Sequence, residues 1–279
     1  MIKFTIITLF EDALRPYLET SMMWKAAKNG IVEFDFVNLR EFGLGPHKSV
    51  DDTPYGGGDG MLMRCEPIYA AIESVKEKDP DAKVILPTPD GITWNQELAR
   101  QFAGVEKPET SVEYLEKSIS KKAEMVATGD TFERAPSDTS RVSVRPLGRV
   151  AEGKNDDGNE NGAGPVAGKH YIIFCPHYEG YDARILPLID YKISLGNYVL
   201  TGGELPALII IDSIVRLLPG VLGGDTSATV ESFSDGNNIE FPQYTKPADF
   251  RGLKVPDVLL SGDHGKVAAW RKAHEKHTK

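Results

Sequence analysis

Apolar runs that suit buried strands alternate with helically spaced segments along much of the chain. The apolar runs that fit strands are residues 3–9, 32–37, 83–86 and 171–174. The 3.6-residue spacing predicts helices over residues 13–29, 66–78 and 95–103. Strands that alternate with helices indicate an α/β fold with a parallel sheet, in which ligands commonly bind at the carboxyl ends of the strands.

The stretch from 193 to 223 is the most informative. Its pattern predicts a short strand at Tyr198-Val199-Leu200, then paired glycines, then a helix that ends at Pro219-Gly220. Apolar residues point in almost every direction around this helix, so we expect it to be buried on most sides. The exceptions, Asp212 and Arg216, lie one turn apart and can pair. A core helix and a helix at a subunit interface both fit this pattern.

Two further segments differ in character from this α/β pattern. Between about 105 and 167, Ser, Thr, Glu and Lys dominate and little can be buried, which indicates a partly disordered insertion. After a linker at 223–237, the segment 238–279 predicts a small part whose last helix, about 263–275, has Ser261 as its N-cap. Its lysines and arginines fit a solvated face, or alternatively phosphate contacts.

Composition narrows the class of protein. The formal net charge of −9, from 32 basic and 41 acidic residues, disfavours nucleic-acid binding over the whole surface but allows a local basic patch. Cys65 and Cys175 form no CxxC pair, so neither a disulfide framework nor a metal site is predicted. Reduced cysteines, and no apolar run near the roughly 20 residues that span a bilayer, favour a cytoplasmic protein without a membrane partner.

Three loops have the composition of ligand-binding segments. Four glycines in residues 56–60 either free backbone amides to face an anion or form a flexible turn. Residues 87–91 form a proline-rich turn directly after a predicted strand. Residues 175–184 hold a His, two acids and an Arg after another strand, which favours a site over a solvated turn.

Taken together, these loops resemble the bacterial tRNA (guanine-N1)-methyltransferases, SPOUT-class enzymes that methylate the guanosine 3′ of the anticodon. Four blocks in order carry the resemblance: 50–61 (VDDTPYGGGDGM), 178–184 (YEGYDAR), 195–207 (LGNYVLTGGELPA) and 255–264 (VPDVLLSGDH). It covers residues 1 to about 103 and 168 to about 274.

The resemblance implies a fold, a cofactor and an assembly. Residues 1–222 would form an α/β SPOUT domain whose parallel sheet contains a deep trefoil knot. Residues 238–279 would form a small, mainly helical C-terminal tRNA-binding domain. The protein would be a homodimer that binds S-adenosylmethionine in the knot loops. The cofactor-binding residues implied are Leu86, Pro87, Thr88, Pro89, Pro176, Glu179, Leu195, Gly196, Asn197, Tyr198, Val199, Leu200, Gly202, Gly203 and Pro206.

The resemblance also implies catalytic and tRNA-binding residues. Arg216 matches the family's electropositive partner, and Glu231 stands where the family has the Asp that serves as base. The extra methylene of a Glu can displace the reacting oxygen by more than about 1 Å, and Asp235 is the obvious substitute base. Asp51, Tyr55 and Lys246 would contact tRNA. Mg²⁺ is associated with the family, but the sequence indicates no dedicated metal site.

Other departures from the family pattern concern the cofactor loop and the end of the chain. Pro176-His177 replaces a Gly-Arg pair, Asn197 replaces an Asp, and Asp59 replaces a Pro. We expect the C-terminal domain to be truncated, because family members usually continue into a further basic segment. Two alternatives to a guanine-N1 methyltransferase stay open. Glu231, the insertion and the short C-terminus allow a SPOUT RNA methyltransferase with a shifted target, and loss of the base would leave a non-catalytic protein that binds RNA or the cofactor.

Overall fold

The computed structural model describes residues 1–105, 169–222, 232–233 and 238–277. The insertion expected at about 105–167 lies outside this range apart from Val105. Most of the expected linker also lies outside it, including Glu231 and Asp235.

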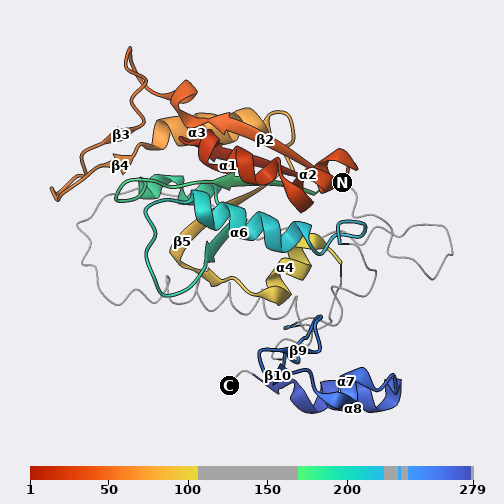
Figure 1. The fold of residues 1–279 in the computed structure, drawn as a ribbon. Coiled ribbons are helices and arrows are strands. Elements are labelled where there is room, and N and C mark those ends of the chain that lie inside the picture. The colour runs from red at the N-terminus through yellow and green to blue at the C-terminus, as the bar shows by residue number, and fades with distance from the viewer. Residues whose placement is uncertain (106–168, 223–231, 234–237, 278–279) are drawn as a thin grey trace, which may run out of the picture. The chain divides into compact units, whose positions relative to one another are not determined.

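A five-stranded parallel sheet forms the centre of residues 1–222 (Figure 1). Its order is β2-β1-β6-β5-β7, and every neighbouring pair is parallel. The strands are β1 (Ile2–Thr8), β2 (Val32–Asn38), β5 (Lys83–Thr93), β6 (Lys169–Phe174) and β7 (Tyr191–Ser194). β1 and β6 are buried along almost their whole length, because both faces of the sheet are covered. The predicted α/β class with a parallel sheet is confirmed.

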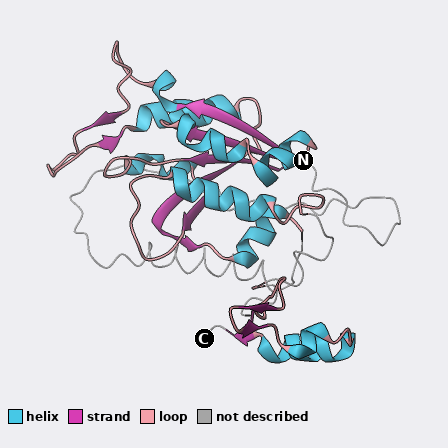
Figure 2. Ribbon diagram, in the orientation of Figure 1, coloured by secondary structure: helices cyan, strands magenta, loops and turns pink. Residues whose placement is uncertain are grey.

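Helices cover both faces of this sheet (Figure 2). One face packs on α1 (Glu11–Leu18), α2 (Ser21–Lys28), α4 (Gln96–Ala103) and α6 (Glu204–Val215). The other packs on α3 (Cys65–Lys76) and the 3₁₀ helices η1 (Leu39–Phe42) and η2 (Ala183–Leu188). Successive strand residues enter opposite cores: Ile6 faces the first cluster and Ile7 the second.

The predicted helix at 13–29 is in fact two helices. α1 ends at Leu18 and α2 begins at Ser21, whose φ of 50° lies in the left-handed region. The hydroxyl of Thr20 donates to the carbonyl oxygens of Pro16 and Tyr17, each at 3.0 Å. A side chain that bonds to the carbonyls of the last turn competes with continued helix, and the apolar spacing carries no trace of it.

The predicted strand at Tyr198-Val199-Leu200 is also wrong. The fifth strand lies upstream, as β7, and residues 198–200 form a loop in which the Val199 side chain is 85% exposed. Gly196, with a φ of 140°, turns the chain away from the sheet edge, where the described part of the chain has no further strand to pair with. Branched and aromatic residues suit a strand only where a neighbour supplies the pairing.

The C-terminal part, residues 238–277, contains two helices and two short ladders. The helices are α7 (Asp257–Leu260) and α8 (His264–His274). β8 (Asn238–Ile239) pairs with β11 (Lys276–His277), and β9 (Asp249–Phe250) pairs with β10 (Leu253–Lys254). The N-cap of α8 is Asp263 rather than Ser261: its carboxylate accepts from the backbone N–H groups of Gly265 and Lys266 at 3.1 Å.

Candidate active site

A cavity of about 490 Å³ lies among the loops at the carboxyl ends of β5, β6 and β7. Three chain segments supply most of its walls, namely residues 87–90, 176–181 and 192–203. The remaining lining residues are Leu62, Ala183, Leu186 and Pro206. This is the edge at which a parallel sheet is expected to bind its ligand, because the carboxyl ends of all its strands meet there.

The first wall is a loop that bulges out of β5. Pro87 and Ile92 both lie opposite Ile193 of β7, so the four residues between them leave the ladder and return to the same point. Within the bulge, the hydroxyl of Thr88 donates to Asp90 Oδ1 at 2.8 Å, and Asp90 also forms an ion pair with Lys192. This wall therefore carries charged groups as well as prolines.

The second wall follows β6. The carbonyl oxygen of Pro176 accepts from the N–H of Gly203 at 2.7 Å, which joins this wall to the start of α6. Its other end is joined to the strand β4 (Leu62–Met63), because the N–H of Met63 donates to the carbonyl oxygen of Gly180 at 2.9 Å. Arg184 pairs with Asp182 at 2.5 Å and holds the pKa of that carboxyl below its ordinary value. The loop is thus fixed at both ends.

The third wall, between β7 and α6, has a glycine where it comes closest to the second wall. A Cβ on Gly203 would lie 2.4 Å from Cδ of Pro176 and 2.7 Å from Cα of Cys175, so no side chain fits there. The next residue, Glu204, begins α6 and accepts a hydrogen bond from the hydroxyl of Thr8 at 2.9 Å. The negative charge of Glu204 suits the positive end of the helix dipole.

Cys175 and His177, which follow each other closely at the start of the second wall, differ in whether they can contact a ligand. Cys175 is fully buried, and burial raises the pKa of its thiol well above the ordinary value, so it serves packing. His177 lines the cavity, and its Nδ1 atom is buried without a hydrogen-bond partner among the described residues. A buried polar atom of this kind needs a partner, and a bound polar ligand can provide one.

The structure brings together thirteen of the fifteen residues expected to bind the cofactor. The exceptions are Leu86, which is fully buried within the sheet, and Asn197, which does not line the cavity. Sequence reasoning missed Asp90, His177, Tyr181 and Lys192 as lining residues. The first three stand inside loops that the sequence did single out. Lys192 lies in β7, where only a three-dimensional structure reveals that it faces Asp90.

The other expected site residues do not line this cavity. Arg216 is the half-buried C-cap of α6, and Glu231 lies outside the described residues. Asp51 lies in the strand β3 (Asp51–Asp52), which pairs with β4, and Tyr55 in the loop between them is 99% exposed. Lys246 belongs to the C-terminal part.

α6 is less buried than its composition predicts. Leu205 and Ile209, one turn apart, are 60% and 47% exposed, whereas the opposite side of the helix enters the core. The neighbouring Asp212 accepts a hydrogen bond from the hydroxyl of Tyr17 on α1, a contact that raises the pKa of Tyr17 to about 12. α6 therefore has an exposed strip of two large apolar side chains, which we call the α6 face.

The fold and the cavity define a class, the α/β proteins that bind a ligand at the carboxyl edge of a parallel sheet. The crystal structure of the tRNA (m1G37) methyltransferase from Aquifex aeolicus is similar to this chain with a TM-score of 0.64 and 29% identity, over 98% of this chain and 88% of that one. The tRNA (guanine-N(1)-)-methyltransferase of Lactiplantibacillus plantarum is 40% identical over 95% of this chain and 82% of its own length. The enzyme of that name from Geobacillus kaustophilus is 39% identical, over 95% and 83%.

The model of the family described as tRNA (Guanine-1)-methyltransferase TrmD matches residues 2–109 and 157–279. The chain belongs to this family of tRNA-methylating enzymes, as its sequence motifs predicted. Membership implies the use of S-adenosylmethionine and a tRNA substrate. No helix among the described residues is long and apolar enough to cross a membrane.

Proposed function

We propose that this chain, as a homodimer in the cytoplasm, transfers a methyl group from S-adenosylmethionine to N1 of guanosine 37, the nucleotide next to the tRNA anticodon. The observation that carries the proposal is the cavity at the sheet edge, lined by the loops that resemble the family's cofactor segments. Isothermal titration with S-adenosylmethionine, followed by methyl transfer to an unmodified tRNA transcript, tests it. Methylation at another nucleotide would favour a shifted target, and binding without transfer a non-catalytic relative.

The residues around the cavity suit S-adenosylmethionine. Its flat adenine and polar amino-acid end need an apolar slot with a few polar groups, and the lining offers Pro87, Leu195 and Leu200 beside the orphaned Nδ1 of His177. Because Gly203 has no side chain, its backbone packs directly on Pro176 and Cys175, and main-chain atoms lie close to the slot. When bound, the cofactor supplies a methyl group carried on a positively charged sulfur.

Two residues would act on the guanine. Its N1 carries a proton, so a carboxylate has to remove it, and we assign this role to Glu231. Negative charge that moves to O6 needs a nearby cation, and we assign that role to Arg216. The next residue in the sequence, Ser232, contacts the C-terminal part: its hydroxyl oxygen accepts from the N–H of Glu240 at 3.0 Å.

Glu231→Gln is expected to lower the single-turnover rate of methyl transfer by roughly 10²–10⁴-fold, because the amide cannot take the N1 proton. Glu231→Asp is the matched control and should keep or increase the rate, since Asp has the family's side-chain length. If Glu231→Gln transfers at the wild-type rate and Asp235→Asn does not, Asp235 is the base and our assignment is wrong.

The α6 face supports the homodimer. Leu205 and Ile209 expose apolar surface on a helix that also begins at the cavity, and such a patch is covered most simply by the same patch of a second copy. In this arrangement the linker and C-terminal part of one subunit would complete the site of the other. The trefoil knot and a role for Mg²⁺ stay predictions from the resemblance. Among the described residues, no three His, Cys, Asp or Glu side chains gather as metal ligands.

Ile209→Asp is expected to weaken dimerisation by more than about 100-fold, because it would bury an unpaired carboxylate in the interface. Sedimentation velocity at micromolar concentration should then show monomers in place of dimers. Leu44→Asp, a change at an exposed leucine after η1 on the opposite side of the sheet from α6, is the control and should leave the dimer intact. A wild-type protein that sediments as a monomer would contradict the proposed assembly.

The C-terminal part supports tRNA as the partner. Residues 238–279 hold eight Lys and Arg against five Asp and Glu, a net charge of +3 in a chain whose total is −9. Positive charge concentrated in one segment provides the phosphate contacts that the overall balance does not. Lys246, expected to bind tRNA, lies in this segment.

A further inference from the structure

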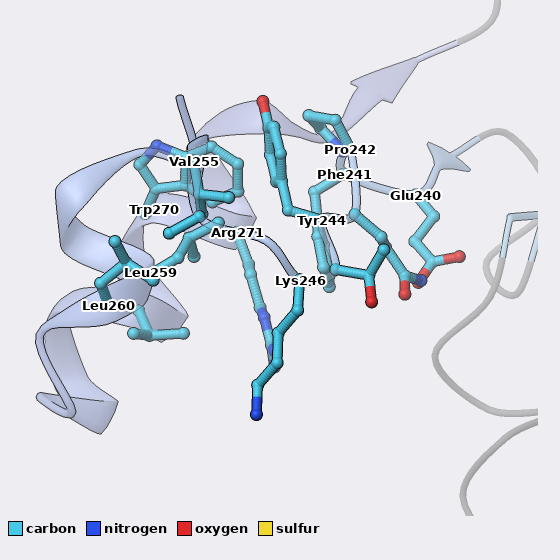
Figure 3. A pocket seen from close by; sticks show the side chains of 14 residues that line it. Glu240, Phe241, Pro242, Tyr244, Lys246, Val255, Leu259, Leu260, Trp270 and Arg271 are labelled. Atoms are coloured by element: carbon cyan, nitrogen blue, oxygen red, sulfur yellow. The ribbon is translucent and has the colours of Figure 1, made fainter. Parts of the chain in front are cut away.

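A second cavity, of about 940 Å³, lies within the C-terminal part, and only one of its lining residues, Lys246, has been given a role above (Figure 3). Its walls include Tyr244, Leu259, Leu260 and Trp270. None of the described side chains from 239 to 276 is fully buried. The apolar side chains of this part therefore border a hollow instead of filling a core, and a flat apolar ligand can occupy such a hollow.

Two aromatic rings of the cavity, Trp270 and Tyr244, differ in how much of their surface is open to a ligand. Trp270 stacks on the imidazole of His274 with ring centroids 4.0 Å apart, so one face of its indole is covered. His274 Nδ1 also bonds to the carbonyl oxygen of Trp270 at 2.7 Å. Tyr244 meets Trp270 edge-on, with centroids 6.3 Å apart, and remains 49% exposed. The tyrosine ring is thus the open platform, and Trp270 is its fixed neighbour.

Two cations border the same cavity. The guanidinium of Arg271 lies 4.9 Å from the ring centroid of Phe241, which holds it in place. In Figure 3 the side chains of Arg271 and Lys246 extend in the same direction. An apolar peptide has no negative group that could pair with these charges. A nucleotide fits both features of the cavity, because its base can stack on an aromatic ring while its phosphate pairs with Lys and Arg.

We propose that this cavity binds one unstacked nucleobase of the RNA substrate, stacked on Tyr244, with Lys246 and Arg271 at the adjoining phosphates. Stacking involves the π-face that every base has, so the site would hold the RNA without reading its sequence. The identity of the RNA as tRNA rests on the proposed function, whereas the binding of a base in this cavity does not require catalysis.

The first experiment measures the affinity of an unmodified tRNA transcript for the full-length protein. Tyr244→Ala is expected to raise the Kd for tRNA about tenfold, because a stacked base is lost. Tyr244→Phe keeps the ring and should stay within about twofold of wild type. Leu253→Ala, in the same part but outside the cavity lining, is the surface control. An unchanged affinity for S-adenosylmethionine would show that the sheet domain stays folded, and an unchanged far-UV circular dichroism spectrum would show the same for the C-terminal part.

A second readout leaves Tyr244 in place. Replacing Trp24 and Trp94 by Phe leaves Trp270 as the only one of the chain's three tryptophans. Binding of the transcript should then quench the fluorescence of Trp270. If tRNA binds without quenching, or if Tyr244→Ala binds as tightly as wild type, the proposal is wrong. A lower kcat with an unchanged Kd would also overturn it, because Tyr244 would then affect catalysis and not the binding of RNA. Quenching without methylation would contradict the proposed function alone.

Discussion

Arg216→Ala is expected to lower the rate of methyl transfer by roughly 10²–10³-fold while leaving the affinity for S-adenosylmethionine unchanged. Arg216 caps the far end of α6, thirteen residues and about 20 Å of helix from Gly203, which borders the cofactor cavity. In the proposed homodimer, this end of α6 leads into the linker that would complete the other subunit's site, so the cation would stabilise charge on guanine O6 there without touching the cofactor of its own subunit. Single-turnover transfer to tRNA and isothermal titration with the cofactor measure the two quantities separately.

The matched variant is Arg216→Lys. It keeps the charge but loses the planar fork of donors, so an intermediate rate is expected. Undiminished transfer by Arg216→Ala would show that the catalytic assignment is wrong. A loss of cofactor affinity in that variant would instead mean that Arg216 holds α6 and the cavity in shape.

Gly203→Ala is expected to abolish detectable cofactor binding and to destabilise the protein by about 1–3 kcal/mol. The new methyl group would collide with the ring of Pro176 and the backbone of Cys175, neither of which can swing aside. The hydrogen bond between the N–H of Gly203 and the carbonyl oxygen of Pro176 would stretch as well. Titration with S-adenosylmethionine and the melting temperature report the two effects.

The control for this substitution is Gly265→Ala in the first turn of α8. There a Cβ would meet only Asp263 Oδ1, at 3.4 Å, which is an ordinary contact. Cofactor affinity and melting temperature should therefore stay at wild-type values or rise slightly, since alanine favours helix. If Gly203→Ala binds the cofactor normally, the close approach of the two loops is not needed for the site.

The sheet could be predicted from the sequence because burial on both faces leaves unbroken apolar runs, as in β1 and β6. The break between α1 and α2 could not, because it depends on one hydroxyl, that of Thr20, which bonds to the preceding turn. The wrong prediction of a strand at 198–200 shows the same limit: the local preference is present, but none of the described strands lies beside these residues to pair with them.

The candidate site was predictable to the extent that loops after parallel strands must meet at one edge. The family resemblance added the individual cofactor residues. Contacts between segments distant in sequence, such as Lys192 with Asp90, required the folded chain. The exposure of Leu205 and Ile209 is a related case: apolar spacing marks a side chain as one that avoids water, but does not say whether its own core or another molecule covers it.

The bulge in β5 has a consequence for the kinetics of cofactor binding. Because both of its ends pair with Ile193, the loss of chain freedom in this wall occurs when the protein folds, and little is left to lose when a small molecule arrives. Association should then follow a single concentration-dependent step without a slow loop-ordering phase. The backbone of residues 87–92 should have the same conformation with and without cofactor.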